Sequence, residues 1–231
     1  MIDHPRKPDA IGIEDAQFVY PAGGFGIHIA GLHITHGQPT AIIGPSGAGK
    51  TTLLHLIAGI LSPTLGHVRV DGVDLSELGN SARRAFRLTR VGLVFQSFEL
   101  IDHLNVLDNV LLPMRLGRAL KVDKPARQRA LDLVDLVGLS RYTHKKPTGL
   151  SQGERQRVGV CRALITRPAI VLADEPTANL DPDTARSVVS ALLDCTQAVG
   201  GTLAMVTHDH IKLDRFNHVV DLKTILQARP S

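Results

Sequence analysis

The chain has 231 residues, of which 43% are hydrophobic and 21% are charged, and its 26 basic and 22 acidic side chains give a net charge of +4. This composition predicts one globular α/β domain and excludes a wholly disordered chain. With no Trp, two Tyr and six Phe, the chain lacks the aromatic side chains on which a single-strand nucleic-acid binder stacks bases, so we expect no nucleic-acid partner.

Neither a targeting signal nor a membrane anchor is indicated by the sequence. Residues 1–10 lack the apolar segment that a secretory signal needs, and the longest apolar runs, such as 56–61, are far too short to cross a bilayer. Cys161 and Cys195 fall on predicted helices, which indicates small core residues in a reducing compartment rather than a disulfide. We therefore expect a cytoplasmic chain that reaches a membrane only through a partner.

The first part of the chain, residues 11–37, alternates in places between apolar and polar positions, as at Ile27 and Ile29. That period of two predicts short antiparallel strands with one face in solvent. Four apolar runs further on indicate strands that are buried on both faces, and they lie at 40–43, 91–95, 170–173 and 203–206. Helical patterns separate these runs, so the predicted fold class is α/β with a mostly parallel sheet.

Apolar positions at helical spacing predict the remaining elements. Helices are expected from residue 50 to Gly59, at 105–116 and at 125–137. Asp181-Pro182 is a strong helix start, because a capping carboxylate precedes proline at the first helical position, and this helix should extend to about residue 198. We expect a single domain over 1–231, with a core of about 11–95 and 166–222 and an inserted α-helical subdomain at about 97–165.

A glycine-rich loop follows the first buried strand and opens a helix. Its sequence fits the phosphate-binding pattern G-x-x-x-x-G-K-[ST] of a P-loop. The glycines let backbone N–H groups turn toward phosphate oxygens, and the helix start adds its positive dipole end. We expect Lys50 to reach the β- and γ-phosphates of ATP and the Thr51 hydroxyl to hold Mg²⁺. The residues expected to bind ATP here are Gly44, Pro45, Ser46, Gly47, Ala48, Gly49, Lys50, Thr51 and Thr52.

Two acidic residues, Asp174 and Glu175, directly follow the buried run at 170–173. Carboxylates at the end of a buried strand are costly unless they have a role, and in an open α/β sheet this end is where ligands bind. We expect Asp174 to face Mg²⁺ and Glu175 to orient or deprotonate the attacking water. The alternative is an acidic helix cap or a surface loop.

The segment Leu150-Ser151-Gln152-Gly153-Glu154 makes the prediction more specific. It resembles the signature of the ABC (ATP-binding cassette) family, usually LSGGQ or LSGGE, and departs from it at Gln152, where glycine is usual. The resemblance implies that Ser151, Gly153 and Glu154 bind the ATP held by the other subunit of a dimer. Ser151 and Glu154 also form a capping box, and the two interpretations are compatible because a helix start is itself an anion site.

Other motifs of the family occur in the expected order. Gln96 resembles the Q-loop glutamine, which implies contacts with Mg²⁺ and water and a following loop that touches the membrane partner. Asn179 and Asp181 resemble the D-loop at the dimer seam, and His208 resembles the switch histidine that senses the γ-phosphate. Tyr20 lies where an aromatic residue is expected to stack on adenine, with an ordinary strand residue as the alternative. The resemblance implies catalytic roles for Lys50, Gln96, Glu175 and His208, and metal contacts for Thr51, Gln96 and Asp174.

The resemblance covers about residues 11–222, and the stretch 95–113 is similar to the branch of lipoprotein-release, macrolide-efflux and cell-division ABC ATPases. It implies a P-loop NTPase fold with an N-terminal antiparallel β subdomain, ATP hydrolysis, and a homodimer or paired ATPase subunit. It also implies an integral membrane permease subunit that holds the chain on the cytoplasmic face of the cell membrane. We expect an exporter or a complex that extracts lipids or lipoproteins. An importer ATPase and a non-transport ATPase that regulates cell-wall enzymes are the alternatives.

Several histidines invite a metal interpretation that their spacing does not support. His28, His33 and His36 fall in or beside alternating strands and match no standard zinc pattern. We expect them to be surface or hydrogen-bonded residues, and we expect His210 to face solvent.

Overall fold

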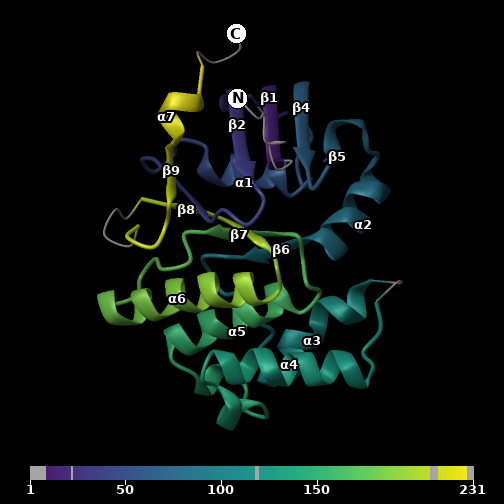
Figure 1. The fold of residues 1–231 in the computed structure, drawn as a ribbon, viewed down its shortest axis with the longest axis vertical. Coiled ribbons are helices and arrows are strands. Elements are labelled where there is room, and N and C mark those ends of the chain that lie inside the picture. Colours follow the sequence, from purple (N-terminus) through teal and green to yellow (C-terminus); the bar gives the residue numbers. More distant parts are fainter. Residues whose placement is uncertain (1–8, 22, 118–119, 209–212, 228–231) are drawn as a thin grey trace, which may run out of the picture.

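The structure is a computed structural model that describes residues 9–21, 23–117, 120–208 and 213–227. Two of the sequence expectations therefore fall outside the described residues: the lack of a secretory signal, which rests mostly on residues 1–8, and the solvent-facing position of His210. Figure 1 shows a parallel sheet across the middle of the molecule, with an antiparallel sheet on one side and a layer of helices on the other. None of the helices in the described ranges is long and apolar enough to span a membrane.

The antiparallel sheet has the strand order β2-β1-β4-β5. Its strands are β1 (Asp9–Val19), β2 (Gly26–Thr35), β4 (Leu65–Val70) and β5 (Val73–Asp74). The alternating pattern predicted antiparallel strands correctly, but β1 and β2 have 11 and 10 residues and are not short. β1 is long because it pairs on both sides, with β2 and with β4. The sequence pattern did not predict β4 or β5.

The parallel sheet has the strand order β6-β7-β8-β3-β9. Its strands are β3 (Thr40–Ile43), β6 (Val91–Val94), β7 (Ile170–Asp174), β8 (Thr202–Thr207) and β9 (His218–Asp221). Each of the four predicted apolar runs is a strand, and the pairs along this order run parallel. The α/β fold class with a parallel sheet and an N-terminal antiparallel sheet is thus confirmed.

Alternate residues of the parallel strands pack into two separate hydrophobic cores. In β7, Ile170 and Leu172 pack with helix α1 (Lys50–Ile57) and the antiparallel sheet, whereas Val171 and Ala173 pack with the helices on the other face. Successive side chains of a strand point to opposite faces, so a strand that is buried on both faces has a continuous apolar sequence. This packing explains why the four runs could be recognised.

Helices cover both faces of the parallel sheet. α1 lies between the two sheets, and the opposite face is covered by the layer of α5 and α6, with α3 and α4 beyond (Figure 1). The bounds of these and the remaining helices are α2 (Asn80–Arg90), α3 (Val106–Leu116), α4 (Lys124–Leu136), α5 (Gln152–Leu164), α6 (Pro182–Ala198) and α7 (Leu222–Ile225), with 3₁₀ turns at Leu75–Glu77, Ser140–Tyr142 and Pro147–Gly149. Asp181 caps α6, and Cys161 and Cys195 are buried free thiols, as the sequence predicted.

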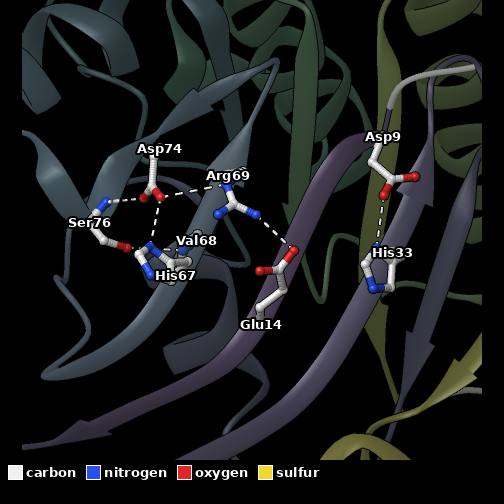
Figure 2. Close-up of polar contacts among 8 residues, drawn as sticks. All are labelled: Asp9, Glu14, His33, His67, Val68, Arg69, Asp74 and Ser76. Atoms are coloured by element: carbon white, nitrogen blue, oxygen red, sulfur yellow. Dashed lines mark hydrogen bonds and ion pairs between the residues drawn. The ribbon is translucent and has the colours of Figure 1, made fainter.

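A polar network on the antiparallel sheet ties β4, β5 and β1 together (Figure 2). Asp74 accepts a hydrogen bond from the Ser76 N–H at 3.0 Å and lies 2.8 Å from His67 Nδ1. Arg69 lies between Asp74 and Glu14, with nitrogen–oxygen distances of 3.6 and 2.7 Å. Burial by itself would raise the pKa of Asp74, but the hydrogen bonds from Ser76 and His67 outweigh it and hold that pKa below its usual value.

We expect Asp74→Ala to lower the free energy of unfolding at pH 7 by about 1 kcal/mol, the typical effect of a lost cap. A depressed pKa in the folded state means that the stabilisation is present above the unfolded pKa and is lost as the pH falls through the folded pKa. The stability difference between wild type and variant should therefore shrink below about pH 4. Urea unfolding at a series of pH values measures this stability difference. A difference that does not change with pH would contradict the lowered pKa of Asp74.

The three histidines of residues 28–36 do not form a common site. Each lies beside a different aspartate: His28 at 2.5 Å from Asp15, His33 at 2.8 Å from Asp9, and His36 at 3.8 Å from Asp71. Figure 2 includes the pair of His33 and Asp9, which joins β2 to β1. Within the described ranges, no group of three or more His, Cys, Asp or Glu is arranged to hold a metal ion.

Candidate active site

The glycine-rich loop, residues 44–49, connects β3 to α1. Gly47 and Gly49 have φ angles of +76° and +102°, which residues with a side chain rarely adopt. A Cβ on Gly49 would lie 2.8 Å from Ile27 Cγ2 and 3.3 Å from Phe25 Cζ. Glycine at position 49 is therefore required twice, by its own backbone conformation and by the close approach of the antiparallel sheet.

The start of α1 has no side-chain cap. Gly49 occupies the capping position without a side chain that could accept a hydrogen bond, and the first turn holds no acidic residue. The first N–H groups and the positive end of the helix dipole are thus available to an anion. Lys50 is only 7% exposed, and its Nζ donates to the carbonyls of Gly44 at 2.8 Å and Pro45 at 3.1 Å. The lysine therefore spans the loop whose N–H groups would bind phosphate.

Asp174, at the end of β7, lies beside the start of α1. The Thr51 hydroxyl donates to Asp174 Oδ2 at 2.8 Å. Burial raises the pKa of Asp174, and the neighbouring Glu175 carboxylate raises it further, against the lowering effect of the Thr51 hydrogen bond. Hydroxyl and carboxylate oxygens are ligands that Mg²⁺ prefers, and a cation would offset the repulsion between the two carboxylates. These residues therefore fit a magnesium ion.

Glu175 points toward Lys50 and His208. Its Oε1 lies 3.2 Å from Lys50 Nζ, and its Oε2 lies 2.7 Å from His208 Nδ1. The residue has a φ of +44°, a left-handed conformation that costs about 1–3 kcal/mol for a residue other than glycine. The Glu175 carboxylate contacts Lys50 and His208, whereas the carboxylate of the preceding Asp174 contacts Thr51. As a result, a carboxylate whose side chain is 13% exposed is held between a lysine and a histidine.

These groups surround a cavity of about 370 Å³, within the usual range for ligand sites. Its walls are formed by Phe25, Ser46, Gly47, Gly49, Lys50, Thr51, Thr52, Gln96, Asp174 and Glu175. Gln96, two residues beyond β6, therefore lines the same cavity as the glycine-rich loop and the acidic pair Asp174 and Glu175. Tyr20 is not part of the wall. Its hydroxyl lies 3.3 Å from Thr52 Oγ1, and its ring centre lies 6.2 Å from that of Phe25.

Phe25 is a cavity residue that the sequence did not reveal. No motif marks it, and it reaches the cavity only because the connection between β1 and β2 folds against the glycine-rich loop. The structure thus places two aromatic side chains in or beside the wall of this cavity. Phe25 forms part of its wall, and the Tyr20 hydroxyl contacts Thr52, another residue of the wall.

The signature segment 150–154 lies at the start of α5, away from this cavity wall. The Glu154 N–H donates to the Ser151 hydroxyl at 3.3 Å, and the Ser151 N–H donates to the Glu154 carboxylate at 2.8 Å. This is the capping box that the sequence indicated, and α5 accordingly begins at Gln152. The hydrogen bond from the Ser151 N–H lowers the pKa of Glu154. The cavity and the start of α5 are therefore two separate features of one chain.

Gly153 allows α5 to approach α6 closely. A Cβ at this position would lie 2.2 Å from Thr184 Cγ2. Thr184 is held in turn by Asp181, whose carboxylate accepts a hydrogen bond from the Thr184 N–H at 3.0 Å. Two of the predicted site residues, Gly153 and Asp181, are thus linked through a threonine that the sequence analysis did not single out.

We expect Gly153→Ala to lower the free energy of unfolding by about 1 kcal/mol, because overpacking costs about 1–3 kcal/mol while alanine gains about 1 kcal/mol over glycine in a helix. Adding Thr184→Ser removes the methyl group in the way and should restore most of that stability. Urea unfolding of the single and double variants measures both effects. Equal losses in the two would show that Thr184 is not the obstacle.

The loop after Gln96 is held by α5. Arg162, which is 8% exposed, donates to the carbonyls of Phe98, at 2.8 Å, and of Glu99. These two loop residues have positive φ angles of +56° and +50°. A buried arginine thus fixes a strained loop beside the cavity, and the helix that begins at the signature segment is connected to the loop that contains Gln96.

The fold, the P-loop cavity and the capped start of α5 define an ATP-binding cassette. The ABC transporter family profile matches residues 27–178, and the chain belongs to this family. It is an ATP-hydrolysing subunit of a membrane ABC complex. The predicted resemblance to the branch that includes lipoprotein-release ATPases is also confirmed, because several of the similar proteins are lipoprotein-releasing ATP-binding proteins.

Three relatives illustrate the similarity. The lipoprotein-releasing system ATP-binding protein LolD of Hydrogenovibrio crunogenus is 46% identical over 181 residues, which cover 77% of this chain and 78% of that protein. The methionine import ATP-binding protein MetN of Cutibacterium acnes is 43% identical over 77% of this chain and 48% of that protein. The dimeric structure of the ATP-binding cassette MJ0796 in a post-hydrolysis state bound to ADP and Pi has a TM-score of 0.73, with 33% identity, and covers 86% of this chain and 88% of that one.

Proposed function

We propose that this chain powers the release of lipoproteins from a membrane, as a paired ATPase on the cytoplasmic face of an integral membrane permease. The observation that carries the proposal is the 46% identity to a lipoprotein-releasing ATP-binding protein, over 77% of this chain and 78% of that protein. The permease would bind the cargo, and this chain would supply the conformational cycle driven by ATP.

The proposed working unit is a dimer. Each ATP would lie between the cavity of one subunit and Ser151, Gly153 and Glu154 of the other, with Asp181 at the seam. The separation of the cavity from the start of α5 within one chain supports this arrangement. The dimeric cassette bound to ADP and Pi supports it as well.

The proposed chemistry uses residues that converge on the cavity. Lys50 and the N–H groups at the start of α1 would bind the phosphates, and Glu175 would orient or deprotonate the attacking water. His208 lies 2.7 Å from Glu175 Oε2 and would hold that carboxylate in position. When bound, Mg²⁺ would neutralise charge on the phosphates, held by Thr51, Asp174 and Gln96.

A second candidate function is an importer ATPase, and the observation in its favour is the 43% identity to a methionine import protein. That match covers 48% of the importer protein, against 78% of the lipoprotein-releasing protein. The difference favours the lipoprotein-release proposal, because the similarity to the importer is confined to part of its length.

Affinity purification distinguishes the two candidates. The Glu175→Gln variant is isolated with ATP from detergent-solubilised membranes, and the proteins that accompany it are identified. A multi-pass protein with a large extracytoplasmic domain, together with accumulation of lipoproteins in the membrane when the chain is depleted, is the expected result. A permease accompanied by a separate substrate-binding protein would favour the importer, and recovery of soluble partners alone would contradict both.

A further inference from the structure

A cluster of three arginines lies at the end of α1 that is remote from the P-loop. We call Arg83, Arg84 and Arg87, all on α2, the α2 arginine cluster. Together with Gly59, Ile60, Asn80 and Ser81 they line a cavity of about 460 Å³. None of these residues lines the nucleotide cavity. α1 begins at Lys50 in the P-loop and is about 12 Å long at 1.5 Å per residue, so one helix separates the two cavities.

The cluster has no carboxylate partner among the residues that the structure describes. Arg83 donates to the side-chain oxygen of Asn80 at 2.5 Å, and Arg87 donates to the carbonyl of Gly59 at 3.1 Å; both acceptors are neutral. Of the four arginines on α2, Arg90 alone forms an ion pair within the described ranges. The first turn of α2 contains no acidic residue.

The end of α1 offsets only part of this charge. The Gly59 carbonyl that Arg87 contacts lies at the negative end of the α1 dipole, which is equivalent to about half an elementary charge. Burial lowers the pKa of Arg87, and the charges of Arg84 and Arg83 lower it further. The three guanidinium groups therefore repel one another around a cavity, with about two and a half positive charges left uncompensated.

We propose that the α2 arginine cluster binds a phosphate group, carried by an anionic phospholipid headgroup or present as a free phosphate ion. A free phosphate ion offers up to about two negative charges and three or more acceptor oxygens, and the phosphodiester of a phospholipid headgroup offers about one charge and two unesterified oxygens. Both groups can accept hydrogen bonds from more than one guanidinium group at once. The start of α2 adds N–H groups, because Gly79 at its capping position has no side chain to accept their hydrogen bonds. Ile60, 41% exposed, gives the cavity an apolar rim.

The test compares two double variants that remove the same charge. Arg83→Gln/Arg84→Gln disables the cluster and leaves Arg87 to hold Gly59. Arg127→Gln/Arg167→Gln is the control, because both residues are exposed arginines elsewhere on the surface. Urea unfolding of each protein checks that the variants remain folded. ATP hydrolysis, followed in parallel, checks that the nucleotide cavity still works, so a loss of binding at the cluster is distinguishable from a loss of the ATPase.

Two probes separate the possible sources of the phosphate. Flotation with vesicles of phosphatidylglycerol and phosphatidylcholine, against vesicles of phosphatidylcholine alone, tests the headgroup. Titration with inorganic phosphate, followed through the NMR signals of the arginine Nε–H groups and compared with succinate, tests the free ion. We compare affinities for whichever of the two probes the wild type binds. For that probe, the cluster variant should bind about 30-fold more weakly than the wild type, and the affinity of the control variant should change by less than about threefold.

Each outcome decides the proposal. Selective loss of binding to anionic vesicles would identify a headgroup site, and phosphate-induced shifts of the Arg83, Arg84 and Arg87 signals without vesicle binding would identify a free-ion site. Equal losses in the two double variants would overturn the proposal in favour of a general effect of surface charge. Binding of neither probe, or equal binding of succinate and phosphate, would also overturn it.

Discussion

Glu175→Gln is expected to reduce the steady-state rate of ATP hydrolysis by at least about 100-fold, the lower end of what a positioned general base contributes. Glutamine has nearly the same shape as glutamate, so the contacts with Lys50 at 3.2 Å and His208 at 2.7 Å can be replaced by hydrogen bonds of similar geometry. It can neither accept a proton from water nor carry the negative charge. The loss should therefore fall on turnover rather than on binding.

ATP affinity provides the second measurement on this variant. Removing the Glu175 charge frees Lys50 from an ion pair and removes a negative charge from the phosphate cavity, so ATP should bind at least as tightly as in the wild type. Release of phosphate and titration with ATP give the two quantities. Glu77→Gln, at an exposed position remote in sequence from the cavity residues, is the matched control. Normal hydrolysis by Glu175→Gln would remove Glu175 from the mechanism.

Lys50→Ala is expected to weaken ATP binding by about 10- to 150-fold, which corresponds to the about 1.5–3 kcal/mol of a hydrogen bond to a charged group. Among the described residues that line the cavity, Lys50 alone has a cationic side chain, and it already bridges the carbonyls of Gly44 and Pro45. Its loss removes both the charge that attracts phosphate and a support of the loop.

The contact with Glu175 complicates the effect of Lys50→Ala, because the variant also leaves the Glu175 carboxylate without its lysine partner. The double variant Lys50→Ala/Glu175→Gln separates the two effects. If Lys50 contacts phosphate directly, ATP binding in the double variant stays weak. Full recovery would mean that repulsion by Glu175 causes the loss. Lys223→Ala, on the exposed side of α7, is the control for a lost charge.

Secondary structure was predictable where the pattern of the sequence is local. The four apolar runs became strands β3, β6, β7 and β8, because a strand buried on both faces must be apolar throughout. Asp181 and Ser151 begin helices because each side chain caps N–H groups two or three residues ahead. Strands β4 and β5 and the arginine-rich α2 were not predicted, because their short or polar sequences take their structure from neighbours.

The sequence by itself predicted which residues would bear the chemistry. The P-loop and the acidic pair are recognisable because each motif is complete within a few consecutive residues, whereas Gln96 and His208 were assigned through the resemblance to the ABC family. The structure brings the P-loop, the acidic pair and Gln96 to one cavity and places His208 against Glu175.

Only the tertiary structure decided the contacts between distant segments. It placed Phe25 in the cavity wall, Thr184 against Gly153, and Arg162 on the loop that follows Gln96. It also gathered the α2 arginine cluster around the end of α1. These contacts join positions that are far apart in the chain, and packing brings them together through surface shapes that no local pattern of residues encodes.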